Sequence, residues 1–333
     1  MAEVELSIVL VNYKTPELLR QCLASVFKHT AAAFEVIVVD NNSEDNSEQL
    51  INAEFPTVRW INKNYNSGFA RGNNEGIKAA SGKYVLLLNS DALLEEDAIT
   101  ASLTKYKALE QQHKLGLLGC KICSFSGKIL PSVHERFMGL KDLLRANAIF
   151  IYLFRDKARQ QSYSEKWYLT SHFAAHISGA FMLFNKSRLN SPQYWLDEDF
   201  FLYAEDVEWC GRLQKMGLEH YYYADARILH KDSGSSVDSN WKQMQVLLSQ
   251  LLFIFKHYGG LYFTLYVWLL KFNIRLDDRL YKGKKTAHTE AEVQGANRRK
   301  EISAMLTRYL TRLKQNYKAT VNSATDFLKY ETE

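Results

Sequence analysis

The sequence has few of the residues that mark flexible linkers and cross-linked scaffolds. Only 4 prolines and 16 glycines occur in 333 residues, which leaves little room for long linkers or low-complexity tracts. The 4 cysteines are too few and too scattered for a disulfide framework. Cys120 and Cys123 have CxxC spacing, but a second pair for a zinc site is missing. This pair lies in a strand-like run, so we interpret it as core thiols of a protein in a reducing cytosol.

Apolar runs long enough to cross a bilayer are also missing. Residues 246–255 and 261–270 are apolar, but neither run reaches the roughly 20 residues that a membrane span needs. The chain starts almost directly with a strand-like run, so we expect no signal peptide. We predict that the two apolar runs form a helical hairpin that lies on a membrane surface or packs against protein.

Positive charge is concentrated near the C-terminus. Of the net +5, residues 271–333 contribute 14 Lys/Arg against 8 Asp/Glu, and the rest is near neutral. An apolar stripe at helical spacing there is formed by Ile302, Met305, Leu306, Leu310 and Leu313, and it is flanked by Arg299, Lys300, Arg308, Arg312 and Lys314. This pattern predicts an amphipathic basic helix that contacts anionic lipid, a partner helix or a second copy of the chain, or whose charges are simply solvated. Because nothing pairs it with a recognition module, we do not expect nucleic acid as a partner.

Strand-like and helix-like segments alternate through the first two thirds of the chain. Buried strands are predicted at 6–12, 36–40, 58–62, 84–88, 115–123, 176–184, 219–223 and 228–230. Helices are predicted at 16–27, 71–80, 95–111 and 205–216, with Thr15 as a cap and Pro16 at the first helical position. This order predicts an α/β fold with a mostly parallel central sheet and helices on both faces.

Polar residues follow the predicted strands at four successive strand ends: Asn12, residues 40–43, residues 64–68 and residues 89–91. Ligands of open α/β sheets bind beyond the carboxyl ends of the strands, so this repetition favours a site for a polar ligand. Asn, Asp and Ser are also common in turns, which is the alternative for any single cluster. The turn after the first strand, residues 12–16, has no glycine, which argues against a dinucleotide-binding oxidoreductase.

Three further positions carry side chains suited to chemistry. Asp91 and His230, each at a strand end, could bind a divalent metal through oxygen and nitrogen. Asp206, with Glu205 beside it, is predicted at a helix N-terminus, where the helix dipole favours the ionised form that a general base requires. Each position also has an ordinary structural interpretation, as a turn residue, a packed histidine and a helix cap.

Seven sequence blocks in order resemble family-2 glycosyltransferases of the GT-A fold, particularly their rhamnosyltransferase-like branch, over about residues 6–236. They are Ser7-Ile8-Val9-Leu10-Val11-Asn12-Tyr13, Val38-Val39-Asp40-Asn41-Asn42-Ser43, Asn66-Ser67-Gly68-Phe69-Ala70-Arg71-Gly72-Asn73-Asn74, Leu87-Leu88-Asn89-Ser90-Asp91, Ser178-Gly179-Ala180-Phe181-Met182, Phe200-Phe201-Leu202-Tyr203-Ala204-Glu205-Asp206-Val207-Glu208 and Ile228-Leu229-His230.

The resemblance implies roles for individual residues. Asp40 would bond the nucleobase of a nucleoside diphosphate sugar, with Asn12 and Asn42 in the same donor site, and Arg71 would reach the base or the diphosphate.

At the reacting end, the resemblance makes Asp91 and His230 ligands of Mg²⁺ or Mn²⁺, with Asn89 beside the donor. Asp206 would be the catalytic base, with Glu205 orienting or capping. Gly179 would let the backbone approach the sugar, because a side chain would intrude there.

One departure concerns the metal motif, which reads Asn89-Ser90-Asp91 and so has one negative charge fewer than Asp-x-Asp. The Gln-x-x-Arg-Trp motif of processive synthases is missing, so we expect transfer of one sugar, or a short defined number, per acceptor. The implied activity is inverting transfer of L-rhamnose from dTDP-L-rhamnose to a glycan or lipid-linked glycan of a bacterial cell surface. A UDP-hexose or UDP-hexosamine donor is the alternative within the class, and a non-catalytic binding protein with a basic tail is the alternative outside it.

The predicted organisation has two parts. Residues 1–238 form the GT-A catalytic domain, with a Rossmann-like nucleotide-sugar-binding half at 1–123 and an acceptor half at 124–238. Residues 239–333 form a helical, basic appendage that associates with membrane or joins two copies into a homo-oligomer. We expect a cytoplasmic protein, with peripheral contact at the inner face of the membrane.

Overall fold

The computed structural model describes residues 4–134, 165–231, 239–282, 293, 297 and 300–310. Leu313 of the predicted apolar stripe and the basic residues Arg299, Arg312 and Lys314 lie outside the described residues. Contacts divide the chain into two units. One consists of residues 1–137 with 163–237, and the other of residues 138–162 with 238–333.

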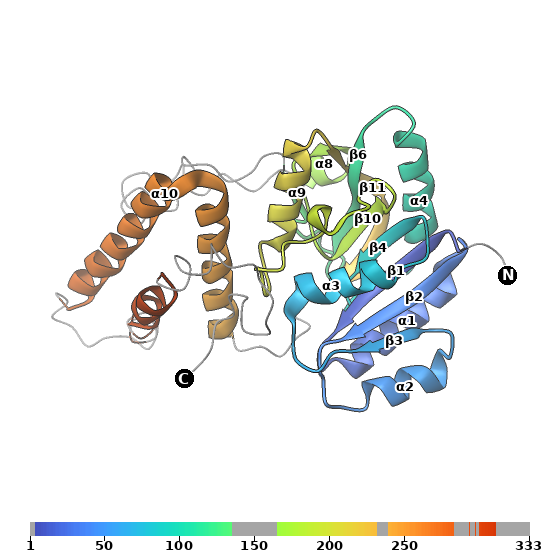
Figure 1. Ribbon diagram of the computed structural model, residues 1–333, viewed down its shortest axis with the longest axis horizontal. Helices are drawn as coiled ribbons and strands as arrows, with labels where there is room; N and C mark the ends of the chain where they lie inside the picture. The colour runs from blue at the N-terminus through green and yellow to red at the C-terminus, as the bar shows by residue number, and fades with distance from the viewer. Residues whose placement is uncertain are drawn as a thin grey trace. The chain divides into compact units, whose positions relative to one another are not determined.

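The first unit is built around one sheet, which has nine strands within its described residues. The strand order is β3-β2-β1-β4-β10-β6-β11-β5, and β8 pairs with β11. The strands of this sheet are β1 (Leu6–Asn12), β2 (Phe34–Asp40), β3 (Arg59–Asn62), β4 (Tyr84–Leu88), β5 (Ala92–Leu93), β6 (Leu115–Cys123), β8 (His172–Ala174), β10 (Phe181–Asn185) and β11 (Glu219–His230). Strands β1 to β4 pair in parallel, and β10 runs antiparallel between β4 and β6 (Figure 1).

Helices cover both faces of this sheet, as the sequence predicts. The helices of this unit are α1 (Pro16–His29), α2 (Ser47–Glu54), α3 (Gly68–Ala79), α4 (Ala98–Leu109), α8 (Glu165–Tyr168), α9 (Glu205–Lys215) and the 3-10 turn η1 (Pro192–Tyr194). Side chains alternate along β1, so Ile8 and Leu10 share a core with α1 and α4, whereas Val9 faces the core under α3 and α9. Each of these fully buried aliphatic side chains contributes roughly 1.5–3 kcal/mol of transfer free energy.

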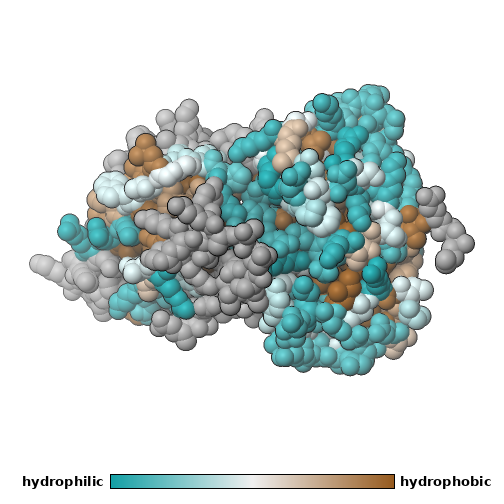
Figure 2. All heavy atoms as spheres, viewed as in Figure 1, coloured by the Kyte–Doolittle hydropathy of each residue, from teal (hydrophilic) through white to brown (hydrophobic). Residues whose placement is uncertain are grey.

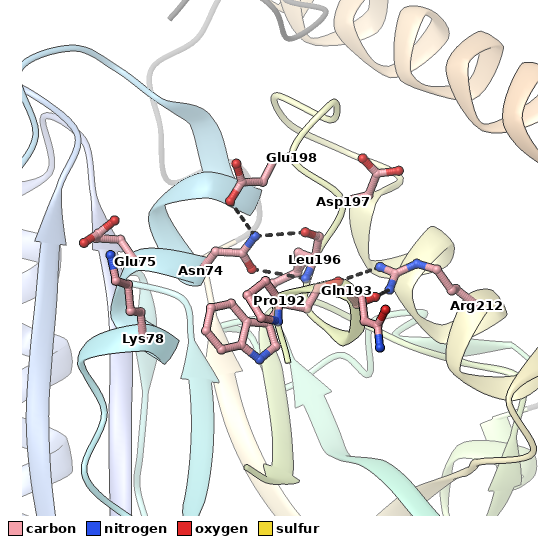
Figure 3. A pocket seen from close by; sticks show the side chains of 10 residues that line it. Asn74, Glu75, Lys78, Pro192, Gln193, Leu196, Asp197, Glu198 and Arg212 are labelled. Carbon is pink, nitrogen blue, oxygen red and sulfur yellow. Dashed lines mark hydrogen bonds between the residues drawn. The ribbon is translucent and has the colours of Figure 1, made fainter. Parts of the chain in front are cut away.

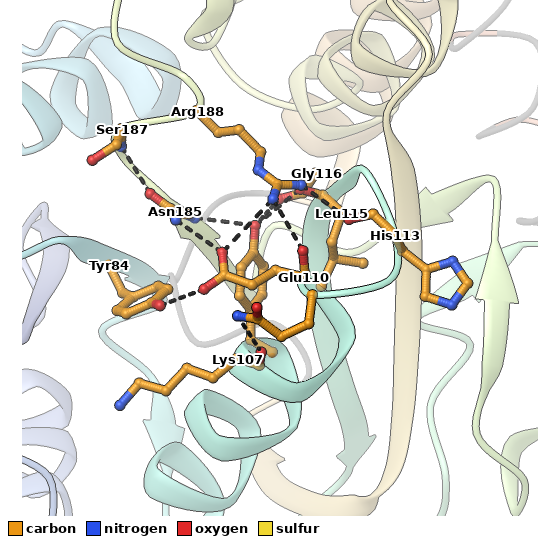
Figure 4. A network of polar contacts seen from close by, with 11 residues as sticks. Tyr84, Lys107, Glu110, His113, Leu115, Gly116, Asn185, Ser187 and Arg188 are labelled. Atoms are coloured by element: carbon orange, nitrogen blue, oxygen red, sulfur yellow. Dashed lines mark hydrogen bonds and ion pairs between the residues drawn. The ribbon is translucent and has the colours of Figure 1, made fainter.

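The end of β4 remote from Asn89 is fixed by a polar network on Glu110, which follows α4 (Figure 4). Its carboxylate accepts hydrogen bonds from the Tyr84 hydroxyl at 2.5 Å and from Nδ2 of Asn185 at 2.9 Å. Arg188 reaches the backbone carbonyls of His113 and Leu115 at 3.2 Å each. Burial and then the Glu110 carboxylate raise the pKa of Tyr84, so its hydroxyl keeps the proton that it donates. The network ties α4 to the sheet, away from the strand ends where the polar clusters lie.

Several predicted elements need correction. The strand predicted at 176–184 is two strands, because residues Ser178 to Ala180 turn between β9 (His176–Ile177) and β10. Strand β9 leaves the main sheet and pairs with β7 (Val133–His134). The strands predicted at 219–223 and 228–230 are one strand, β11, whose register shifts between Tyr223 and Arg227. Periodicity does not reveal such a break or join, because both depend on which neighbouring strand each segment pairs with.

The predicted cap Thr15 is also wrong in detail. It occupies the N-cap position of α1, but its side chain makes no capping hydrogen bond. Its hydroxyl instead donates to Oδ1 of Asn12 at 3.0 Å, so it supports a strand-end residue.

The described part of the second unit is mostly α10 (Ser239–Lys282), whose two arms meet at a kink at Gly259 (Figure 1). The predicted apolar runs 246–255 and 261–270 fall on these two arms. Among the described residues, no helix is long and apolar enough to cross a membrane. In the predicted stripe, Met305 and Leu306 are buried, so those side chains are already covered.

Candidate active site

The first part of the site lies where β1 and β2 end side by side. Nδ2 of Asn12 donates to Oδ1 of Asp40 at 2.7 Å. The Asp40 carboxylate also accepts from the hydroxyl of Ser43 at 2.6 Å and from its backbone N–H at 2.8 Å. A carboxylate offers about four acceptor positions, so one position remains for a ligand donor. Sequence reasoning missed Ser43 as an organiser, although it belongs to the Asp40–Ser43 cluster.

The loop after β2 is tied to the start of α3 through Asn41, another residue that the sequence did not single out. Its amide donates to the carbonyl of Gly68 at 2.8 Å and accepts from the hydroxyl of Ser67 at 2.7 Å. The next residue, Asn42, has a φ of 61°, a left-handed conformation that asparagine tolerates better than most residues. Asn42 thereby lies at the sharp turn between Asp40 and Ser43.

The second part of the site brings together the end of β4 and the end of β11. Nε2 of His230 lies 3.0 Å from Oδ1 of Asp91 and 3.0 Å from Nδ2 of Asn89. Asn89 and His230 are 141 positions apart in sequence. They meet because β5, which follows Asp91 directly, pairs with the last residues of β11. The side chains of Asp91 and His230 are 15% and 18% exposed, so a ligand can reach them.

The pair Asp91 and His230 fits one edge of a divalent metal site. Two adjacent ligand atoms of an octahedral ion, each about 2.1 Å from it, lie about 3 Å apart, which matches the observed separation. Across the residues that the structure describes, no cluster of three or more His, Cys, Asp or Glu side chains could hold a metal. An ion here would therefore need further oxygen atoms from a substrate, as Mg²⁺ sites on phosphates commonly have.

The third part of the site is the N-terminus of α9, which carries Asp206. Oδ2 of Asp206 accepts the backbone N–H of Gly179 at 3.0 Å, and Oδ1 accepts that of Val207 at 2.8 Å. Nε2 of His176 lies 3.3 Å from Oδ2. The Asp206 side chain is 20% exposed, so it is held by the protein and still accessible. His176 is the residue that sequence reasoning missed here, because in the sequence it is only the first residue of an apolar, strand-like run.

The two neighbouring carboxyl groups differ in protonation. Burial by itself raises the pKa of Asp206, but the facing imidazole of His176 and the two backbone N–H groups outweigh burial and hold the pKa below its ordinary value. Burial, followed by the negative charge of Asp206, raises the pKa of Glu205 well above its ordinary value. Oε2 of Glu205 is buried and has no hydrogen-bond partner. At neutral pH, Asp206 is thus the ionised member of the pair.

Gly179 connects the second and third parts of the site. Its N–H holds Asp206, and the carbonyl of the next residue, Ala180, accepts the backbone N–H of Asn89 at 3.2 Å. A Cβ added at Gly179 would lie 3.4 Å from the Phe69 ring and 3.6 Å from Cβ of Asp206, which are ordinary contacts. The protein itself therefore leaves room for a Cβ atom at Gly179, and the predicted need for glycine concerns a bound sugar.

Helix α3 is bonded to the loop that leads into α9. Residues of both line a cavity of about 670 Å³ (Figure 3). The amide of Asn74 bonds both the carbonyl and the N–H of Leu196, at 2.9 and 3.1 Å. Nε of Arg71 donates to the carbonyl of Glu198 at 3.2 Å and lies 3.9 Å from its carboxylate. Arg71 was predicted to reach the base or the diphosphate, and the contact described here is with the loop.

The turn before α9 is strained. Tyr203 and Ala204 both have positive φ, at 69° and 64°, although neither is glycine. The left-handed conformation costs roughly 1–2 kcal/mol for such residues. Upstream, the N–H of Phe69 bonds the carbonyl of Phe201 at 2.7 Å, which anchors the turn to α3. These contacts place Asp206 at the first turn of α9 near Gly179.

The fold, which brings two strand-end clusters and the N-terminus of α9 together, is that of a GT-A type glycosyltransferase domain. The model of the family described as "Glycosyl transferase family 2" matches residues 7–178, just over half of the chain. This chain belongs to glycosyl transferase family 2, in agreement with the resemblance seen in the sequence.

Individual relatives are more distant. Glycosyltransferase GlyG of Streptococcus pneumoniae serotype 4 is 30% identical over 110 residues, which are 32% of this chain and only 36% of that protein. N-acetylglucosaminyl-diphospho-decaprenol L-rhamnosyltransferase of Mycobacterium tuberculosis is 26% identical over 246 residues, 69% of this chain and 77% of that protein.

Among solved structures, mannosyltransferase PcManGT from Pyrobaculum calidifontis, in complex with GDP-Man and Mn²⁺, has a TM-score of 0.56 at 13% identity. The alignment covers 92% of this chain and 87% of that one. At this identity, the likeness supports the common fold alone.

Proposed function

We propose that this chain transfers one sugar from a nucleoside diphosphate donor to a hydroxyl group of a glycan or lipid-linked glycan, with inversion at the anomeric carbon. The observation that carries the proposal is Asp206: an accessible carboxylate, kept ionised at a helix N-terminus and held through both oxygens. A general base must be ionised and reachable in this way.

The reaction is a single displacement. Asp206 takes the proton of the acceptor hydroxyl while the acceptor oxygen forms a bond to the anomeric carbon. The bond from that carbon to the diphosphate oxygen breaks on the opposite face, and the nucleoside diphosphate leaves with the electron pair. Because attack and departure are on opposite faces, the configuration inverts, and Asp206 then returns its proton to solvent.

The donor end of the site is assigned to the strand-end clusters. Asp40 offers its remaining acceptor position to an N–H of the base, and Asn12 and Ser43 keep its carboxylate in place. Asp91 and His230 would hold Mg²⁺ or Mn²⁺, with Asn89 beside them. When bound, the ion supplies positive charge that stabilises the leaving diphosphate.

For the sugar, we propose L-rhamnose from dTDP-L-rhamnose. The support is the Asn-Ser-Asp form of the metal motif and the similarity to a relative named an L-rhamnosyltransferase. A UDP-hexose or UDP-hexosamine donor remains the alternative, since the cluster at Asp40 offers an acceptor that uracil and thymine would use alike.

The first experiment is a donor screen with the full chain, in which release of dTDP, UDP or GDP is measured with Mn²⁺ or Mg²⁺ present. Release of dTDP from dTDP-L-rhamnose in preference to the UDP-sugars supports the proposal. Preferential use of a UDP-sugar replaces the donor but keeps the reaction type. Binding of a nucleotide sugar without turnover, even with glycan acceptors added, favours the non-catalytic alternative.

We also propose that α10 contacts the anionic inner face of the cytoplasmic membrane, where a lipid-linked acceptor would be found. Its second arm exposes large apolar side chains at helical spacing, Leu261 (88% exposed), Leu265, Trp268 and Phe272. Exposed Arg275 and Arg279 continue the same spacing. Hydrophobic surface is visible on this part of the chain (Figure 2). Apolar side chains followed by basic ones suit the headgroup region of an anionic bilayer.

Vesicle co-sedimentation tests this contact. Replacing Leu265 and Trp268 by serine should abolish sedimentation with phosphatidylglycerol vesicles, whereas Phe125→Ser, which alters an exposed ring of the first unit, should not. If vesicle binding persists in the double variant but a dimer seen by light scattering dissociates, the exposed apolar face of the second arm of α10 joins two copies of the chain instead.

A further inference from the structure

His176 faces the proposed base and has no part in the predicted site. It lies on β9, which is held by two hydrogen bonds from its flanking residues to the segment around β7 and by one contact with α9. The N–H of Ala175 bonds the carbonyl of His134 at 2.9 Å, that of Ser178 bonds the carbonyl of Ser132 at 2.9 Å, and that of Ile177 contacts Sγ of Cys210 on α9 at 3.4 Å. The imidazole is buried, and its Nε2 lies 3.3 Å from Oδ2 of Asp206. The ring is thus placed against the carboxylate by rigid structure.

From these contacts, we propose that His176 is a positioning residue for Asp206: its imidazole orients the carboxylate and keeps it ionised, and so sets the lower pH limit of the transfer reaction. This inference rests on the proposed role of Asp206 as the base. It assigns a function to a residue outside the seven sequence blocks, next to the Ser178-Gly179 turn.

Titratable groups face His176 from α9, β7 and β11. On α9, it faces Asp206, and the adjacent Glu205 is kept neutral by its raised pKa. On β7, the His134 ring stacks on it with centroids 5.4 Å apart, and burial followed by the charge of His176 lowers the pKa of His134. On β11, burial lowers the pKa of His220 to about 4. Burial thus lowers the pKa of both neighbouring imidazoles, which disfavours a positive charge on either of them beside Asp206.

The orienting role follows from which oxygen is held. Oδ2 receives both the Gly179 N–H and the approach of Nε2 of His176, while Oδ1 receives the Val207 N–H. Nε2 lies at ion-pair distance from Oδ2 without a hydrogen bond in this geometry, so a protonated imidazole would attract Oδ2 and restrict rotation of the carboxylate. The Asp206 side chain is 20% exposed, so an acceptor hydroxyl can still reach it. Removal of the imidazole would take away a favourable influence that opposes burial, so the pKa of the carboxyl should rise.

The kinetic test compares His176→Phe, which keeps a ring but loses the donor, with His176→Gln, which keeps an N–H donor. His172→Gln is the control, because that imidazole packs on Trp167 with centroids 4.1 Å apart. In His176→Phe, the acidic limb of the kcat profile should move up by about one pH unit, as expected for loss of a close favourable partner. At a fixed pH on the acidic limb, kcat should fall by up to about tenfold, while the donor KM stays within about twofold. Glutamine should restore part of the loss, and the control should follow wild type.

An acidic limb that stays at its wild-type position in His176→Phe would overturn the proposal, as would equal loss in the Phe and Gln variants. A second measurement does not depend on turnover. The ¹³C-carboxyl signal of Asp206, identified by its loss in Asp206→Asn, should titrate at higher pH in His176→Phe than in wild type. If the chain transfers no sugar from any donor, the proposed function fails, while this titration still decides whether His176 controls Asp206. An unchanged titration refutes that control even in an active enzyme.

Discussion

The backbone N–H of Gly179 donates to Oδ2 of Asp206 at 3.0 Å, across 27 residues of sequence. This one hydrogen bond joins the turn between β9 and β10 to the first turn of α9. Because the next residue, Ala180, bonds the backbone of Asn89, the proposed base is linked through two hydrogen bonds to the end of β4. The relationship explains why the residues proposed for donor and for acceptor chemistry occupy one region of the fold.

Replacing Asp206 by asparagine should lower kcat about 10²–10⁴-fold, because a neutral amide cannot take the acceptor proton. Donor affinity, measured by isothermal titration of the nucleotide sugar, should stay within about twofold, since the change alters no strand-end cluster at Asp40 or Asp91. The exposed Asp225 provides the matched control, and Asp225→Asn should leave kcat unchanged. Near-normal turnover in Asp206→Asn would remove the assignment of the base.

The pair Asp91 and His230 should control metal dependence. Asp91→Asn and His230→Gln should each raise the Mn²⁺ concentration needed for half-maximal activity by tenfold or more, since each removes one of two protein ligands, and EDTA should stop the wild-type reaction.

His113 and Glu219 form the control for this experiment. They are another histidine–carboxylate pair, at 3.1 Å, on the exposed surface. His113→Gln should therefore leave the Mn²⁺ dependence as in wild type. Full wild-type activity in EDTA would exclude the metal role of Asp91 and His230.

Glu205→Gln should change the pH dependence of stability. Because the folded-state pKa of Glu205 is raised, its contribution to stability is fully present below its unfolded pKa and is lost as pH rises through the folded pKa. The free energy of unfolding of Glu205→Gln, measured by urea titration, should therefore increase relative to that of wild type as pH rises from 4 to 8. The exposed Glu96→Gln variant should run parallel to wild type over this range. A constant difference between Glu205→Gln and wild type would contradict the raised pKa.

Gly68→Ala should damage both folding and the site. Gly68 has a φ of 77°, and an added Cβ would lie 2.2 Å from the carbonyl oxygen of Phe201, in the loop that leads into α9. The left-handed conformation and a clash with backbone together should cost roughly 3–5 kcal/mol.

Gly127 separates the two effects, because its φ of 81° is similar but no atom lies within 4 Å of the added Cβ. Gly127→Ala should thus cost only about 1–2 kcal/mol. Equal losses of thermal stability in the two variants would show that contact with Phe201 contributes nothing.

Much of the sheet could be predicted from local sequence. Runs such as residues 84–88 and 115–123 are apolar on both faces, which is the mark of a strand covered by helices on both sides, and the predicted bounds of β4 and β6 agree with the structure. The helices α1 and α9 begin at the predicted residues Pro16 and Glu205. The separation of β9 from β10 could not be predicted, because it depends on β7 taking β9 as its partner.

The sequence by itself determined the α/β class, the strand-end polar clusters and membership of the family, since these depend on residue type and order. Only the tertiary structure decided which side chains meet. Asp91 reaches His230 because β5 pairs with β11, and His176 reaches Asp206 because β9 leaves the sheet toward α9. The physical reason is that a charge interaction acts over a few ångströms, whereas the pairs that it joins are set by strand pairing between segments remote in the chain.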